Sequence, residues 1–314
     1  MKRKILILSL IFFCLTCARA YPYWIWTPKT GKFVNPKHEV KGAPKDQLAY
    51  AMSFYEGKKY QDAKREFKKL VKAYPKSAEA AEAQYYLGRT EEAQGKLYEA
   101  FLAYQKVIDK YPFSERIQEI IEREFKIADA FMEGAKRKAM GIALPVENPS
   151  IEIYTKIVEN STYGPLAPKA QYKLGLVLKS LARFYEAEDA FNKLISNYPD
   201  SEWVEPAKFQ VASCSAALSK GADYDRGTAE DAKEKFEEFV KEHPDAALSK
   251  EAEKNINELM EKEAESYFIN GRFYEKQKAW DAARIYYREV VNKYPNSAWS
   301  KKAEEQLKAL EKKK

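Results

Sequence analysis

The stretch GKLYEAFLAYQKVIDKYPFS, residues 95–114, decides the fold because its pattern recurs along the chain. Ala100, Tyr104 and Val107 are four and three residues apart, so they lie on one face of a predicted helix. The helix is expected to end before Pro112, since proline has no amide hydrogen and restricts the residue before it. A serine two residues after the proline can cap the next helix with its hydroxyl.

The same pattern occurs five times in register. In every copy the alanine precedes the proline by twelve residues and the aromatic residue precedes it by eight. Small residues let two antiparallel helices approach closely, and the aromatic side chain is expected to fill the gap between neighbouring helix pairs. The copies span 57–77, 95–114, 181–201, 231–246 and 278–297, and three of them have a glycine twelve residues before the alanine, namely Gly88, Gly175 and Gly271.

The combination x-L-G, then A-x3-F/Y, then P resembles the tetratricopeptide repeat. That resemblance implies an all-α fold, an α-solenoid of about six tetratricopeptide helix pairs with a C-terminal capping helix. The predicted organisation is a signal peptide at 1–20, an aromatic and proline-rich arm at 21–44, an N-terminal repeat half at 45–165, and a C-terminal repeat half with the capping helix at 166–314.

The first twenty residues have the three parts of a secretory signal peptide. A basic start precedes an apolar run from Ile5 to Phe13, and Ala18-Arg19-Ala20 is a small-x-small cleavage site. We therefore expect an exported protein. The segment holds four of the 54 basic residues and none of the 47 acidic residues, so the remaining chain is close to neutral. Without that basicity, a nucleic-acid partner is not expected.

Cysteine usage leaves two possibilities at the N-terminus. Cys17 could be acylated as in bacterial lipoproteins, whose signal ends at a cysteine, or the signal could be cleaved after Ala20. Cys214 is then the single cysteine of the mature chain, which rules out an intramolecular disulfide. Its position inside a predicted helix favours a buried small residue over a reactive thiol.

Residues 21–44 differ from the repeats in having several prolines and alternating aromatic residues. We favour an extended arm whose aromatic side chains pack on the first helix pair. One alternative is a small hairpin of Trp24, Trp26 and Phe33 around the Lys29-Thr30-Gly31 turn. Another is an interfacial segment, since tyrosine and tryptophan sit well among lipid headgroups.

The sequence lacks the patterns of enzymatic chemistry. It has two histidines and no cysteine or acidic cluster at metal-ligand spacing. It has no nucleophile elbow, no phosphate-binding glycine loop and no dinucleotide fingerprint. We therefore expect no metal, no cofactor and no enzymatic activity.

Residues 46–310 resemble the BamD family of the outer-membrane β-barrel assembly complex. The resemblance is strongest in DYDRGTAEDAKEKFEEFVKEHPD (223–245) and in the long helix and final repeat after it. Family members are periplasm-facing lipoproteins. The resemblance implies a scaffold at the inner face of the outer membrane whose C-terminal repeats bind a barrel-assembly protein with POTRA domains. The N-terminal repeats would receive unfolded outer-membrane protein segments. By this match the predicted partner-binding residues are Arg272, Phe273, Tyr274 and Trp280.

The repeats are also compatible with a different periplasmic role, that of a coordinator associated with the Tol–Pal system or the cell wall. In either case the first helices of the repeats would line a groove for a peptide. Aromatic and cationic side chains there would suit a peptide that ends in an aromatic residue and a free carboxylate. Packing of these tyrosines between repeats is the alternative. Repeat register assigns Tyr55, Tyr85, Arg89, Tyr172 and Lys179 to the groove.

Overall fold

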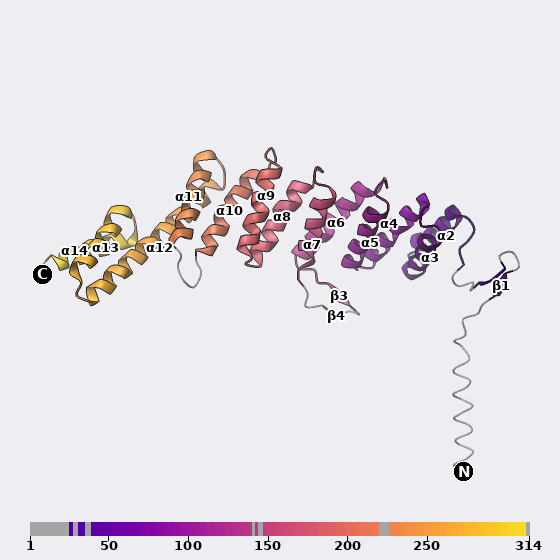
Figure 1. Cartoon of the computed structure of the whole chain (residues 1–314), viewed down its shortest axis with the longest axis horizontal. Helices are drawn as coiled ribbons and strands as arrows, with labels where there is room; N and C mark the ends of the chain where they lie inside the picture. The colour runs from indigo at the N-terminus through magenta and orange to yellow at the C-terminus, as the bar shows by residue number, and fades with distance from the viewer. Residues whose placement is uncertain are drawn as a thin grey trace, which may run out of the picture. The chain divides into compact units, whose positions relative to one another are not determined.

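The computed structural model describes residues 25–27, 31–34, 39–139, 142–143, 147–219 and 226–311. In these residues the chain forms thirteen helices and two short β-hairpins (Figure 1). The predicted all-α tetratricopeptide-repeat solenoid is confirmed, with six helix pairs and one closing helix.

The pairs follow one another along the chain. They are α2 (Pro44–Glu56) with α3 (Tyr60–Ala73), α4 (Ala78–Ala93) with α5 (Leu97–Lys110), α6 (Ile117–Met132) with α7 (Pro149–Asn160), α8 (Ala167–Ser180) with α9 (Phe184–Asn197), α10 (Val204–Leu218) with α11 (Arg226–Glu242), and α12 (Ser249–Lys276) with α13 (Trp280–Lys293), followed by α14 (Ala298–Leu310). The chain divides into two compact units, of which the first comprises residues 1–120 with 137–144 and the second residues 121–136 with 145–314.

The recurring motif forms the interior of the second helix in its pairs. In all five copies the alanine, the aromatic residue and the apolar residue three positions later are at most 1% exposed. Burial of each large side chain contributes about 1.5–3 kcal/mol. The buried sets are Ala63, Phe67 and Leu70; Ala100, Tyr104 and Val107; Ala187, Phe191 and Leu194; Ala232, Phe236 and Phe239; and Ala283, Tyr287 and Val290.

The three glycines explain how closely the helices of a pair approach. A Cβ atom built on Gly175 would lie 2.5 Å from Cε1 of Phe191, inside the distance that real Cβ atoms keep. Gly88 and Gly271 meet the tyrosine rings of their own pairs in the same way. The ring of Phe191 also belongs to a buried cluster with Val211 of the next pair. It therefore fills space within its pair as well as between pairs.

A buried glutamine is a second recurring feature, and the sequence analysis missed it. The side-chain amide of Gln84 donates to the carbonyl oxygen of Ala103, nineteen residues later, at 2.9 Å. Gln171 makes the equivalent bond to Ala190 at 2.8 Å. These bonds join the two helices of a pair and satisfy polar groups that burial would otherwise leave unpaired. Gln47 of the first pair repeats the contact with the Glu66 carbonyl at 3.1 Å.

The third pair follows the pattern with a serine in place of the alanine. Ser150, Tyr154 and Ile157 of α7 have the motif spacing, and all three are fully buried. The Tyr154 hydroxyl donates to the carboxylate of Asp129 on α6. Burial, together with this carboxylate, raises the pKa of Tyr154. The repeat is thus regular in packing although its sequence is atypical.

The N-terminal arm contains a hairpin. Strand β1 (Ile25–Thr27) pairs antiparallel with β2 (Lys32–Val34), and Trp26 lies opposite Phe33. Their rings make an edge-to-face contact with centroids 5.4 Å apart. The favoured extended arm is therefore wrong at these residues, because cross-strand aromatic pairing stabilises a hairpin. Trp24, Lys29 and Thr30 lie outside the described residues.

A second small hairpin stands where the sequence predicted an irregular loop between α6 and α7. It pairs β3 (Lys138–Ala139) with β4 (Ile142–Ala143). The predicted signal peptide, including Cys17, lies outside the described residues. In the part of the chain that the structure describes, no helix has the length and hydrophobicity needed to span a bilayer.

Replacing the central glycine of a pair tests the close approach. In an ordinary helix Gly→Ala stabilises by roughly 1 kcal/mol. Here we expect Gly175→Ala to lower the free energy of unfolding by about 1–3 kcal/mol, because the new methyl group overlaps Phe191. Urea denaturation followed by circular dichroism measures the change.

The variant Phe191→Leu supplies the control for this overlap. The double variant Gly175→Ala/Phe191→Leu should lose less stability than the two single losses added together, because the smaller side chain makes room for the methyl group. A stabilising Gly175→Ala would contradict the packing described above.

Candidate functional site

In the first unit, part of the predicted groove is a hydrogen-bonded network on one face of α4. Glu82, Tyr85 and Arg89 are three and four residues apart, so they share that face. The Tyr85 hydroxyl donates to the carboxylate of Glu119 at the start of α6, and Arg89 Nη1 donates to the Tyr85 oxygen at 2.8 Å. Tyr85 is only 1% exposed. Tyr85 therefore holds the charged groups around it in position. The Arg89 side chain is partly exposed, so solvent can reach this part of the network.

Arg116, which the sequence analysis did not single out, closes this network. Its Nε and Nη2 atoms donate to the two carboxylate oxygens of Glu82 at 3.0 and 2.7 Å, and Nη1 donates to Glu119 at 3.1 Å. The guanidinium lies 4.9 Å from the centroid of the Tyr85 ring. The bidentate bond to Glu82 raises the pKa of Arg116, so the group stays charged.

Tyr55 reaches the same network through a neighbouring ring. Its centroid lies 5.2 Å from that of Tyr86, which in turn lies 5.2 Å from Tyr85. Both contacts are edge-to-face, the geometry that aromatic pairs prefer. The structure thus brings together three of the five predicted groove residues, Tyr55, Tyr85 and Arg89.

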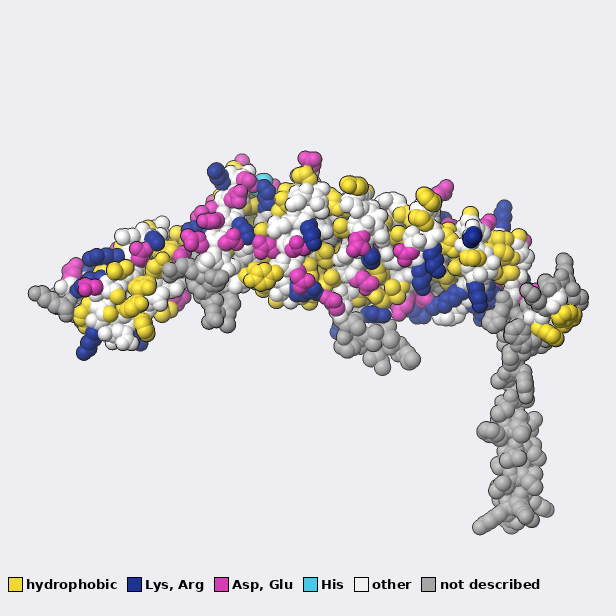
Figure 2. Space-filling model, in the orientation of Figure 1, with side chains coloured by type: hydrophobic (Ala, Val, Ile, Leu, Met, Phe, Trp, Pro, Cys, Tyr) yellow, Lys and Arg dark blue, Asp and Glu magenta, His cyan; other side chains and the backbone are white. Residues whose placement is uncertain are grey.

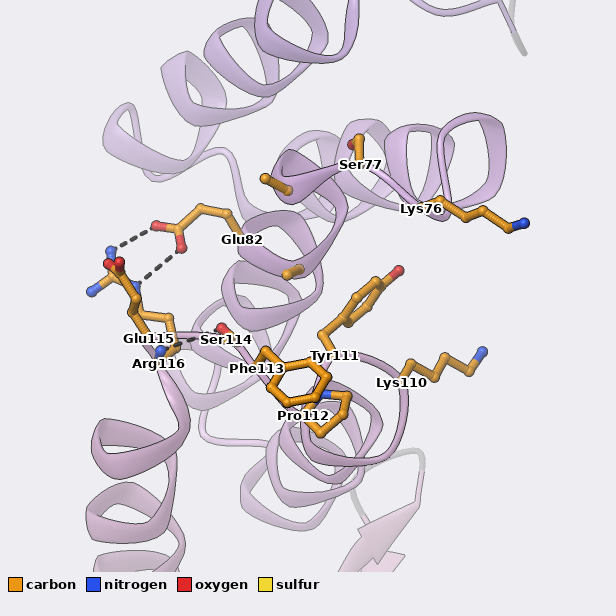
Figure 3. Close-up of a pocket in the computed structure, with 12 residues that line it drawn as sticks. Lys76, Ser77, Glu82, Lys110, Tyr111, Pro112, Phe113, Ser114, Glu115 and Arg116 are labelled. Atoms are coloured by element: carbon orange, nitrogen blue, oxygen red, sulfur yellow. Dashed lines mark hydrogen bonds and ion pairs between the residues drawn. The ribbon is translucent and has the colours of Figure 1, made fainter.

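A pocket of about 1080 Å³ adjoins the network, between the turn after α3 and the turn after α5 (Figure 3). The Glu82–Arg116 pair lies at one side of the pocket, while the Lys76 and Lys110 side chains extend on the other. Phe113 projects from the second turn and is 98% exposed. The Tyr-Pro-Phe order at 111–113 is the signal that sequence reasoning passed over, because prolines at repeat ends were taken only as helix stops.

The other two predicted groove residues belong to the second unit. The Tyr172 ring packs on Trp203, with centroids 5.0 Å apart. Lys179 Nζ donates to Gln210 Oε1 at 2.6 Å and to Ser213 Oγ at 2.7 Å. Burial raises the pKa of Tyr172 and lowers that of Lys179. These two side chains of α8 therefore contact residues of the following repeat.

The predicted partner-binding residues divide between two faces of α12 and α13. Arg272 and Trp280 line a pocket of about 500 Å³ with Gln306 of α14. Phe273 does not line this pocket. It is 56% exposed, and its ring makes an edge-to-face contact with Tyr274. Tyr274 in turn stacks on Tyr286 of α13 at a centroid distance of 5.2 Å.

Two further apolar side chains are exposed on these helices. Ile269, one turn before Phe273 on α12, is 53% exposed, and Ile285 of α13 is 60% exposed. Contiguous apolar side chains on a surface are typical of protein-binding sites, and Ile269 and Phe273 are neighbours on one face of α12. We call Ile269, Phe273 and Ile285 the C-terminal apolar residues.

The described residues give little support to metal binding or to a reactive thiol. Across the described ranges, no group of three or more histidine, cysteine or acidic side chains is placed to hold a metal ion. Cys214 is fully buried on α10, as its helical position suggested. Burial raises the pKa of its thiol to about 11, so the group stays protonated at neutral pH.

Comparison with known proteins agrees with the repeat architecture. Tetratricopeptide-repeat family models match residues 48–115 and 169–201. The chain is a tetratricopeptide-repeat protein. A third family model, YfiO, described as an outer membrane lipoprotein, matches residues 209–314 of this repeat protein. A search among curated proteins found no match.

A search of solved structures matched several bacterial proteins at low sequence identity. The C-terminal part of a repeat-containing protein from Cytophaga hutchinsonii is 16% identical, with 83% of this chain and 87% of that chain covered and a TM-score of 0.37. A Parabacteroides merdae repeat protein is 17% identical over 85% and 98%, with a TM-score of 0.32. The pilF protein of Pseudomonas aeruginosa is 14% identical over 84% and 97%, with a TM-score of 0.29.

The raised pKa of Cys214 gives a direct chemical test. Because the thiolate is the reactive form, a shift from 9.0 to about 11 lowers its population roughly a hundredfold at pH 8. We expect Cys214 in folded residues 21–314 to react with a disulfide reagent at least that much more slowly than in urea. Equal rates in the two conditions would contradict the buried position.

Proposed function

We propose that this repeat protein is a non-enzymatic scaffold of the outer-membrane β-barrel assembly machinery, acting on the periplasmic side. The main support is that the family-model match and the exposed apolar residues fall on the same part of the chain. The outer membrane lipoprotein family model covers residues 209–314, and these residues include the C-terminal apolar residues and the pocket at Arg272. Tetratricopeptide repeats generally serve as protein-interaction scaffolds, which agrees with this role.

In this proposal the C-terminal repeat binds an outer-membrane partner with POTRA domains, as the BamD resemblance implies. Phe273 supplies an exposed aromatic side chain that contacts Tyr274, and Arg272 supplies an exposed cation at the pocket that it lines with Gln306. Aromatic residues and arginine are the residues that most often dominate binding energy at protein interfaces. Tyr274 and Trp280 are half-buried, so they act mainly by fixing this surface.

The first unit in this proposal receives unfolded outer-membrane protein segments. Lys76 and Lys110 beside the pocket are exposed, and the structure gives neither amine an ion-pair partner among the described residues. They can therefore take the free carboxylate of a peptide. The exposed ring of Phe113 can pack against an aromatic residue at the peptide end. Arg89 would offer a second cationic contact from the α4 network, while Tyr172 and Lys179 would extend the peptide-binding surface of the second unit.

The proposed location is the periplasm, at the inner face of the outer membrane. The predicted export signal and the outer membrane lipoprotein family model both support it. Attachment would come from acylation of Cys17, or from protein partners if the signal is cleaved after Ala20. The proposal needs no cofactor.

Peptide binding tests the role of the first unit. A synthetic peptide that ends in phenylalanine with a free carboxylate is titrated against residues 21–314 by isothermal calorimetry. We expect Lys110→Gln to weaken binding about tenfold, since a hydrogen bond to a charged group contributes roughly 1.5 kcal/mol. The matched control is Lys106→Gln, which removes an exposed lysine of the same helix that does not line the pocket.

The same titration tests Arg89 and the carboxylate itself. Amidating the peptide should weaken binding to the unaltered protein, and it should weaken binding to Lys110→Gln less, because that variant has already lost one contact of the carboxylate. Arg89→Gln should weaken binding while the helical circular dichroism signal is kept. An affinity that Arg89→Gln does not change would remove this residue from the proposed groove.

A crosslinked pull-down from the native envelope, identified by mass spectrometry, tests the partner role. We expect a POTRA-bearing outer-membrane protein to be recovered, and Phe273→Ala to reduce its recovery about tenfold or more, as truncation of an interface hot spot does. Tyr185→Ala is the control, because Tyr185 is a 75% exposed aromatic residue of α9. Recovery of Tol–Pal or wall-linked proteins alone would instead favour the envelope-coordinator role.

A further inference from the structure

The second helix of the first pair has an unusual charge. Helix α3 has five basic and two acidic residues, whereas the corresponding helix α5 has two of each and α9 has one basic and three acidic. Figure 2 shows Lys and Arg side chains gathered over this part of the molecule. Among the second helices of the six pairs, α3 therefore has the largest net positive charge.

Within α3 the acidic groups are already occupied. Asp62 accepts from Arg65 at 2.5 Å, and the buried Glu66 accepts from Lys69 at 2.9 Å. Lys68 and Lys72, four residues apart on the exposed face, have no ion-pair partner among the described residues. We call Arg65, Lys68 and Lys72 the α3 basic face, and they leave a net positive charge turned toward solvent.

The N-terminal hairpin adds exposed apolar surface to the same unit. Trp26 and Phe33 are directly opposite one another and are 51% and 64% exposed, and Ile25 is 45% exposed. Because side chains alternate along a strand, Ile25 lies on the other face of the hairpin from Trp26. Both faces thus present a large apolar side chain to solvent.

Two hydrogen bonds attach the chain that follows the hairpin to the first helix pair. The Tyr74 hydroxyl donates to the carbonyl of Gly42 at 2.7 Å, and the Lys41 amide donates to Gln47 Oε1 at 2.6 Å. These bonds attach residues 41 and 42 to the first helix pair. Strand β2 ends at Val34, so six residues separate it from Lys41, and the seven steps from Val34 to Lys41 span at most roughly 25 Å.

From this combination we propose that the hairpin and the α3 basic face together dock on a bilayer containing anionic phospholipid. Exposed tryptophan and phenylalanine enter the headgroup region, where amphipathic aromatic side chains are favoured. The α3 lysines then contact lipid phosphates, whose negative charge attracts them to the surface. This contact requires neither an acyl chain at Cys17 nor the proposed protein partners, so it stands apart from the proposed function.

A bilayer fits these features better than an acidic protein. A protein partner would bury its apolar contacts in a shaped pocket, yet the hairpin presents single large side chains on two opposite faces. Insertion into a fluid headgroup layer has no such shape requirement. The exposed lysine stems of α3 likewise suit a diffuse layer of phosphates.

Cosedimentation with vesicles tests the proposal on residues 21–314, which contain all the described elements and have no acyl chain. We expect binding to vesicles of phosphatidylethanolamine with phosphatidylglycerol and little binding to phosphatidylcholine alone. Lys68→Glu/Lys72→Glu should weaken binding about thirtyfold or more, because two attractions become repulsions. The matched control Lys262→Glu/Lys301→Glu changes the net charge equally on exposed lysines of α12 and α14 and should bind normally.

The hairpin is tested by a second variant. Trp26→Ser/Phe33→Ser should retain binding at low salt and lose the fraction that persists in concentrated salt, where electrostatic attraction is screened. Equal binding to anionic and neutral vesicles, or an equal loss in the lysine control, would overturn the proposal. Failure of the unaltered protein to bind anionic vesicles would overturn it as well, and an acidic protein would then be the better occupant.

Discussion

Three of the six pairs depend on one steric constraint, the contact of an aromatic ring with a helix position that has no side chain. At Gly175 a single methyl group would overlap the Phe191 ring, so the distance between α8 and α9 is set by the ring itself. That distance lets the amide of Gln171 reach the carbonyl of Ala190 in the buried interface. A polar group that would be costly if unpaired thus becomes a second link between the two helices, and Gln47 makes the same link in the first pair.

The sequence predicted the helix pairs correctly wherever the residue types alone determine this contact. Alanine, aromatic and proline at fixed spacing predicted the five regular pairs, because side-chain volume decides them. The third pair is not among the five copies because Ser150 stands where they have alanine, although a serine of nearly the same size packs equally well. The N-terminal hairpin was misjudged because the partner of Trp26 is chosen by strand register, and spacing along the chain does not reveal register.

Site residues were predictable to the extent that repeat register controls their direction. Register placed Tyr85 and Arg89 on one face of α4, and the structure has them there. It could not show that Tyr85 is buried, because the covering groups Glu119 and Arg116 come from the start of the next pair. Arg116 is held by a bidentate bond to Glu82, a contact between residues 34 positions apart that no local pattern encodes.

The packing inside each pair restricts which residues can be buried there. The residues that give this protein its particular function must therefore lie at exposed positions. Charge differs widely among the second helices, from basic at α3 to acidic at α9. Exposed apolar side chains occur at the N-terminal hairpin, at Phe113 in a repeat-end turn, and on α12 and α13. None of these side chains contributes to the glycine–aromatic contact. A repeat protein can therefore acquire a lipid-binding face, a peptide pocket and a partner surface in different parts of the chain without altering the buried packing that holds each pair together.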